Sequence, residues 1–189
     1  MSAPASTAPK GAVETVEPTA AQRTAARRVA EAKATIPDFQ VVVDLDGSAP
    51  SLERAVAAAG RALRAHPRVN AAYVDARFQH YERANVGVVL GEGAVPTVLD
   101  ADAKAPAAIA EELEAARAAV QGGTLTAAAQ AGSTFTVAAL DVAAFTAIIQ
   151  PGHAAALAVG HRALTLSADA RIVTPADAAA FLKALVAAL

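Results

Sequence analysis

Cysteine is absent from this chain of 189 residues. Its absence excludes a disulfide framework, a thiol nucleophile and a metal site with thiolate ligands. Aromatic residues are scarce, at 4% of the sequence, although hydrophobic residues make up 54%. Alanine is abundant instead, and this combination favours helices and strands that pack closely on one another.

The chain also has no marked excess of charge of one sign. It holds 16 lysines and arginines against 18 aspartates and glutamates, a formal net charge of −2. Nucleic acids and anionic membranes bind clusters of positive charge, so neither is an expected partner. The sequence contains no phosphate-binding glycine loop, no nucleophile elbow and no metal-ligand spacing.

Two stretches without charge, residues 120–140 and 142–161, are long enough to be considered as membrane spans. Both contain Gln and Gly, the second also contains Pro151 and His153, and both are rich in small residues, so we expect no membrane span. The N-terminal segment lacks the apolar core of a signal peptide. Because nothing indicates secretion, we expect a cytoplasmic protein.

Composition divides the chain into a tail and one domain. Residues 1–18 are rich in Ala, Pro, Ser and Thr, a composition that buries too little apolar surface to become ordered, so we expect a disordered tail. Residues 19–189 are long enough for one domain with a substantial core. The expected helices cover about residues 19–35, 51–66 (capped by Ser51) and 105–121 (ended by Gly122 and Gly123), and the first expected strand covers 39–46.

The C-terminal part of the chain is typical of a strand followed by a helix. Apolar and polar residues alternate over 164–167, which is the period of a strand. Thr174 then has the features of an N-cap, with Pro175 at the first helical position and Asp177 facing the free N–H groups of the helix.

This stretch resembles the C-terminal signature of the acyltransferase core of 2-oxoacid dehydrogenase complexes, the dihydrolipoyl acyltransferases. The family pattern is S-x-D-H-R-x-x-D-G-A followed by A-A-x-F-L. In this chain the family's catalytic histidine falls on Ala170, its aspartate or asparagine on Thr174, and its glycine on Pro175. The positions that do fit the pattern are Ser167, Asp169, Arg171, Ala176, Phe181 and Leu182.

A second block supports the resemblance. GSTFTVAAL at 132–140 is similar to the family's G-T-F-T-I-S-N-L-G, and AIIQPGHAAALAVG at 147–160 to its A-I-I-N-P-P-Q-A-A-I-L-G-V-G. In the family a serine of the first block helps to hold the oxyanion of the tetrahedral intermediate. Both candidate positions are alanine in this chain, Ala138 and Ala139. The resemblance extends over about residues 20–189.

The resemblance implies an α/β fold of the chloramphenicol acetyltransferase type, a mixed sheet with flanking helices. In the family this fold assembles as a trimer with a site at each interface, so a homotrimer is expected. The lipoyl and subunit-binding domains that precede the core in the family have no counterpart in this sequence. We therefore expect no lipoyl cofactor. No metal or other cofactor is expected either, and binding of coenzyme A is not favoured, although the alternatives below retain it.

The alanines at these positions replace the two groups that carry out catalysis in the resembled family. In the family a histidine abstracts the thiol proton of coenzyme A or dihydrolipoamide, and a serine stabilises the oxyanion across the subunit interface. A general base contributes about 10²–10⁴-fold in rate and an oxyanion donor about 10²–10³-fold. Alanine at positions 138 and 170 performs neither task.

Among the four histidines, His153 is the one surrogate candidate, because its block approaches the active site of the family. Its alternative interpretation, a loop residue after Pro151 and Gly152, is the favoured one. The other histidines are expected at a helix end (His66), on a strand (His80) and in solvent (His161).

Two further interpretations concern the signature itself. The Thr174 hydroxyl is expected to cap its helix and not to replace a catalytic group. Asp169 and Arg171 are expected to form a structural ion pair with the helix at Arg27 or Arg28.

The leading hypothesis is therefore a catalytically inactive homologue of the acyltransferase core, acting as a structural or recruiting subunit of a multi-enzyme assembly. Its expected partners are copies of itself, an active acyltransferase homologue or thiamine-dependent dehydrogenase subunits. One alternative is an acyltransferase with a remodelled site for acyl-CoA or acyl-lipoyl thioesters. Another is a module that binds acyl or pantetheine groups.

Overall fold

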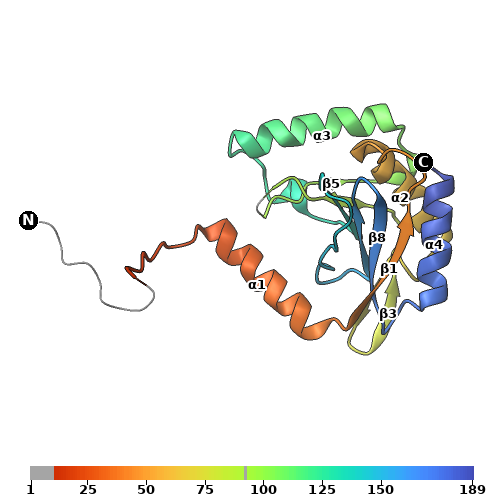
Figure 1. Cartoon of the computed structure of the whole chain (residues 1–189), viewed down its shortest axis with the longest axis horizontal. Coiled ribbons are helices and arrows are strands. Elements are labelled where there is room, and N and C mark those ends of the chain that lie inside the picture. Colours follow the sequence, from red (N-terminus) through yellow and green to blue (C-terminus); the bar gives the residue numbers. More distant parts are fainter. Residues whose placement is uncertain (1–10, 92) are drawn as a thin grey trace, which may run out of the picture.

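The computed structural model describes residues 11–91 and 93–189. A six-stranded mixed sheet with the order β1-β8-β7-β6-β4-β5 forms its centre, and β2 and β3 form a separate antiparallel pair (Figure 1). The strands are β1 (Asp38–Asp44), β2 (Ala71–Val74), β3 (Arg77–His80), β4 (Val86–Val88), β5 (Thr97–Val98), β6 (Phe135–Ala139), β7 (Ala155–Val159) and β8 (Ala163–Asp169).

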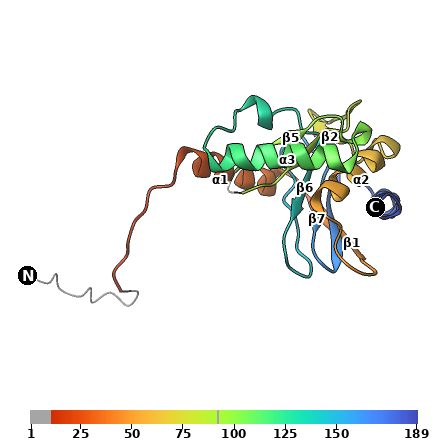
Figure 2. The same ribbon diagram turned by 90° about the horizontal axis from the view of Figure 1, so that it is seen from above.

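Helices cover both faces of this sheet. Helices α2 and α4 pack on one face and α3 packs on α2, whereas the end of α1 packs on the other face beside β7 (Figures 1 and 2). The α-helices are α1 (Ala20–Thr35), α2 (Leu52–Ala65), α3 (Pro106–Gln121) and α4 (Pro175–Ala187), and two short 3₁₀ helices are η1 (Ala101–Ala103) and η2 (Ala128–Gln130).

The predicted α/β class, with its mixed sheet and flanking helices, is confirmed. Ser51 is the N-cap residue of α2, as expected, but its side chain makes no capping hydrogen bond. Residues 11–19 contain no helix or strand, and the first ten residues of the predicted tail lie outside the described part of the chain. Within the described residues, no helix is long and apolar enough to cross a membrane.

The predicted strand and helix at the C-terminal end are β8 and α4. Helix α4 begins at Pro175 with a complete capping box, in which Asp177 N–H donates to the Thr174 hydroxyl (3.2 Å) and Thr174 N–H donates to the Asp177 carboxylate (3.0 Å). Both faces of β8 are buried, so the polar Thr165 and Ser167 lie inside the molecule as well. Apolar and polar residues therefore alternate between the two faces of β8, but both of these faces are buried and neither is exposed to solvent.

Small residues let α2 approach its neighbours closely. A Cβ atom added to Gly60 would lie 2.5 Å from the backbone nitrogen of Asp102 and 2.6 Å from the backbone carbon of Ala101, both in η1. Glycine is therefore required at this crossing by the lack of space. The small side chains of α2 thus permit the close packing between elements that the alanine-rich composition predicts.

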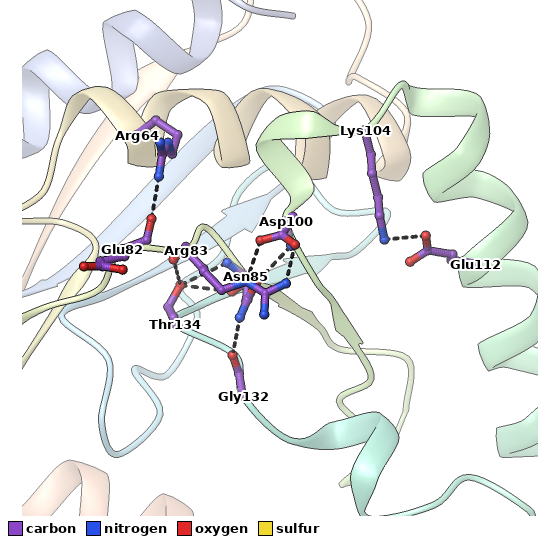
Figure 3. Close-up of polar contacts among 9 residues, drawn as sticks. All are labelled: Arg64, Glu82, Arg83, Asn85, Asp100, Lys104, Glu112, Gly132 and Thr134. Carbon is purple, nitrogen blue, oxygen red and sulfur yellow. Dashed lines mark hydrogen bonds and ion pairs between the residues drawn. The ribbon is translucent and has the colours of Figure 1, made fainter.

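Asn85 joins three segments beside this crossing (Figure 3). Its side chain accepts a hydrogen bond from Asp100 N–H (2.9 Å) and donates one to the Gly132 carbonyl (2.9 Å). Its backbone N–H donates to the Thr134 hydroxyl (3.2 Å). Asp100, which has a positive φ of 50°, also pairs with Arg83. These contacts tie the turn before η1 to the start of β6.

Candidate functional site

The two positions that carry catalysis in the resembled family lie toward opposite ends of the sheet. Ala138 of β6 pairs with Ala158 of β7, which pairs with Thr165 of β8. Ala170 follows the other end of β8, five residues beyond Thr165. With a strand rise of about 3.3 Å per residue, roughly 16 Å separates the two positions along the strand direction. Within one chain, these two positions therefore do not belong to one compact site.

Ala170 sits in an exposed turn that is fixed by its backbone. Its N–H donates to the carbonyl of Pro37 (2.9 Å), which joins the turn to the start of β1. The methyl group of Ala170 carries no proton donor or acceptor. Ala138 is half-buried and Ala139 is exposed, and neither side chain has a polar atom. The side chains at these three positions thus offer no group that titrates or donates a hydrogen bond.

Asp169 and Arg171 form an ion pair with each other. Arg171 Nη2 lies 2.6 Å from Asp169 Oδ2, and Arg171 Nε donates to Oδ1 at 2.9 Å. The prediction that this pair also contacts Arg27 or Arg28 of α1 is wrong. The buried Asp169 carboxylate is already paired with the arginine two residues later. The Arg171 guanidinium also stacks 4.5 Å from the ring centre of Tyr73, so the pair fixes the turn at Ala170 against β2.

The Thr174 hydroxyl is engaged at the start of α4. It accepts from Asp177 N–H and lies 2.7 Å from Asp177 Oδ2. Hydrogen bonding to Thr174 lowers the pKa of the Asp177 carboxyl, which keeps the capping acid ionised. The geometry is that of a helix cap.

His153 is the only buried histidine in the described part of the chain, with 5% of its surface exposed. Its Nε2 lies 2.9 Å from the Ser133 carbonyl and its Nδ1 lies 3.1 Å from the Thr136 hydroxyl. The carbonyl can only accept, so Nε2 carries the proton and Thr136 donates to Nδ1. Both ring nitrogens are therefore engaged.

Burial lowers the pKa of His153 to about 4, so the ring is neutral at pH 7. Its backbone lies close to the turn at Ala170, because the carbonyl of the next residue, Ala154, accepts from Asp169 N–H (2.8 Å). The side chain nevertheless turns toward β6. This arrangement favours a structural role over proton abstraction.

The other histidines lie outside this region. His66 caps the end of α2 and meets the ring of Phe181 edge-on at 5.9 Å. His80 is exposed on β3, and the exposed His161 lies 3.6 Å from Asp141. Within the described ranges, no group of three or more histidine or acidic side chains is placed to hold a metal ion.

Sequence reasoning missed the partners of His153. Ser133 and Thr136 precede it by about twenty residues and belong to the block around β6. Only the parallel pairing of β6 with β7 brings the two blocks together. The contact of Asp141 with His161 was missed for the same reason, although both residues flank the ends of neighbouring strands.

Comparison with known proteins assigns the family. Residues 49–189 match the model of the 2-oxoacid dehydrogenases acyltransferase (catalytic domain). Because this match spans well over half of the chain, the protein belongs to that family. The search of curated proteins finds no match.

Solved structures agree with this assignment at the level of the fold. The dihydrolipoamide acetyltransferase of Azotobacter vinelandii, studied for catalytic roles of a serine, a histidine and an asparagine, aligns with a TM-score of 0.86 and 21% identity over 97% of this chain and 93% of its own. The cubic core of the pyruvate dehydrogenase multienzyme complex aligns with a TM-score of 0.85 and 20% identity over 97% and 93%. Chloramphenicol acetyltransferase is more distant, with a TM-score of 0.54 and 12% identity over 87% and 94%. The expected acyltransferase-type fold is thus confirmed.

Proposed function

We propose that this protein is a non-catalytic member of the acyltransferase family that serves as a structural or recruiting subunit of a multi-enzyme assembly. The observation that carries the proposal is the pair of alanines, Ala170 and Ala138, on an otherwise retained scaffold. A serine, a histidine and an asparagine were examined for catalysis in the Azotobacter relative. In the motif resemblance, the serine corresponds to Ala138 or Ala139, the histidine to Ala170 and the asparagine to the capping Thr174.

The surroundings of these positions support the loss of acyl transfer. His153, which precedes the backbone partner of Asp169, lies near Ala170 but is buried, neutral and bonded through both ring nitrogens. To accept a thiol proton it would have to give up the hydrogen bond from Thr136 and become charged in a buried place, which costs free energy. A remodelled active site built on His153 is for this reason the weaker candidate.

We further propose that the chain assembles, as a homotrimer or with an active acyltransferase homologue or thiamine-dependent dehydrogenase subunits. One solved relative is the cubic core of a multienzyme complex. Ala138 and Ala170 lie far apart within one chain. This separation is expected of a scaffold in which the two positions meet across an interface between two copies. A subunit without catalytic groups can still contribute such an interface.

An acyl-transfer assay with an acyl-CoA donor and dihydrolipoamide as acceptor tests the proposal. The wild-type chain is expected to give no turnover above the uncatalysed reaction. The Ala138→Ser/Ala170→His variant supplies the missing donor and base, and any gain in rate there shows that the retained scaffold still admits substrate.

Turnover by the wild type that disappears in His153→Ala would overturn the proposal, with His80→Ala, an exposed histidine on β3, as the matched control. Thermal-shift measurements with coenzyme A thioesters address the binding-module alternative. A saturable rise in Tm without turnover would favour that alternative.

A further inference from the structure

A polar hollow lies beside helix α1, which runs along one side of the molecule (Figure 1). Its volume is about 530 Å³, which is within the range of sites that bind small molecules. Most of the side chains that line it are charged or polar. Some come from α1, and most of the others come from η2 and from the segments before β6 and β7. This lining indicates a ligand that is itself polar.

Helix α1 presents charges of both signs to this hollow. Arg27 and Arg28 precede Glu31 by four and three residues, so all three side chains lie on one side of the helix. Arginine and glutamate at this spacing often pair with each other. In the described part of the chain, however, none of these three side chains forms an ion pair. Two positive charges and one negative charge are therefore available to a ligand.

The Ser133 hydroxyl is a further donor at the hollow, and the buried His153 fixes its orientation. The protonated Nε2 of His153 lies 2.9 Å from the Ser133 carbonyl and 3.2 Å from the Ser133 hydroxyl oxygen. The hydroxyl oxygen therefore accepts from the ring. Its own proton has no partner among the described residues. Ser133 can thus donate a hydrogen bond to a ligand in the hollow.

Two half-buried glutamines add amide groups to the same hollow. The side-chain oxygen of Gln130 accepts from Val95 N–H (3.1 Å), which holds this side chain in place and leaves its NH₂ group free. The side chain of Gln150 makes no hydrogen bond with the other described residues. Covering such groups with an apolar ligand would cost free energy, because their hydrogen bonds to water would be lost without replacement. The amides therefore favour a ligand with several oxygen acceptors.

We propose that this hollow binds an acidic α-amino acid, with its two carboxylates at Arg27 and Arg28 and its ammonium group at Glu31. The two positive charges and one negative charge of the hollow are the complement of two carboxylates and one ammonium group. An amino acid with a neutral side chain would leave one arginine without a partner. A dicarboxylate without an amino group would face the like charge of Glu31, which is unfavourable. This binding goes beyond the proposed function and needs no acyl transfer.

Isothermal titration calorimetry of the full chain with L-glutamate and L-aspartate tests the site. At least one of them should bind saturably with a Kd below about 1 mM. Arg27→Gln and Arg28→Gln should each raise this Kd about threefold, and the double variant about tenfold, as expected for exposed charge pairs. Lys183→Gln, which removes an exposed cation from α4, is the matched control and should leave the Kd unchanged. Failure of both amino acids to bind the wild type would overturn the proposal.

Glu31→Gln separates the ammonium contact from the carboxylate contacts. This variant should weaken the binding of glutamate about threefold and strengthen that of glutarate, which is glutamate without its amino group, because the like charge is removed. A wild type that binds glutarate as tightly as glutamate, or a Glu31→Gln variant that weakens both ligands equally, would contradict the assignment. All of these measurements report binding directly. Their failure would therefore leave the proposed function, which is tested by acyl transfer, unaffected.

Discussion

Helices α1 and α2 are both rich in alanine and arginine, and yet they occupy opposite environments. Helix α2 buries eight residues, from Ala55 to Leu63, whereas α1 buries one. In α2 the small side chains let η1 approach within contact of the backbone at Gly60. In α1 the same side chains supply helix propensity only. Alanine content thus predicts that a helix forms, whereas packing against neighbouring elements decides whether that helix is buried in the core.

The largest expected effect breaks the close contact of α2. Gly60→Val places new carbon atoms where backbone atoms of Ala101 and Asp102 already lie. We expect a loss of about 3 kcal/mol or more in the free energy of unfolding, at the upper end of overpacking costs. Ala30→Val on the exposed side of α1 is the matched control and should cost about 0.5 kcal/mol. Urea unfolding of both variants measures the difference, and equal losses would contradict the contrast.

The next effect concerns His153, on the sheet face that lies on the same side as α1. The unfolded chain binds a proton to this ring near pH 6.5, and the folded chain does so only near pH 4. The unfolded state therefore binds more protons between these values, so stability is full above pH 6.5 and falls as the pH drops toward 4, by up to about 3 kcal/mol. Unfolding curves at several pH values measure this slope.

His153→Gln provides the control for that slope. A glutamine amide can donate to the Ser133 carbonyl and accept from Thr136 without titrating. The variant should therefore lose much of the pH dependence between 6.5 and 4. If the free energy of unfolding changed with pH equally in the wild type and in His153→Gln, the pKa of His153 would not be lowered by folding, which would contradict the prediction.

A smaller effect comes from one hydroxyl placed in each helix. Ala58 of α2 is fully buried, so Ala58→Ser buries a polar group and should cost about 2 kcal/mol. Ala26 of α1 is exposed, and Ala26→Ser should cost about 0.5 kcal/mol through propensity alone. Thermal unfolding separates the two, and a comparable fall in Tm for both would mean that α1 is covered in solution.

The smallest effect compares two helix caps of the same design. Thr19 of α1 and Thr174 of α4 each form a capping box. Thr174→Ala should cost about 1 kcal/mol, because α4 packs on the core. Thr19→Ala should leave global stability nearly unchanged, because α1 can fray locally without opening the core. Hydrogen exchange of the amides in α1 should instead increase, and unchanged exchange there would argue against local fraying.

Much of the fold was predictable because its signals are local or are carried by motifs. The limits of α1 and α3 follow from Thr19 and from Gly122, which act on residues within one helical turn. The alanines at positions 138 and 170 are visible in the sequence as departures from the family pattern. The partner of Asp169 was not predictable, because the choice between Arg171 and a helix more than 130 positions earlier depends on packing.

The sequence by itself determined the capping boxes, the alanine-rich helices and the loss of polar side chains at Ala138 and Ala170, since each depends on residues close together in the chain. Only the tertiary structure decided that these two positions lie far apart in one chain and that His153 is buried with both nitrogens bonded. The physical reason is that strand register and burial arise from contacts between residues distant in sequence. No local pattern encodes those contacts.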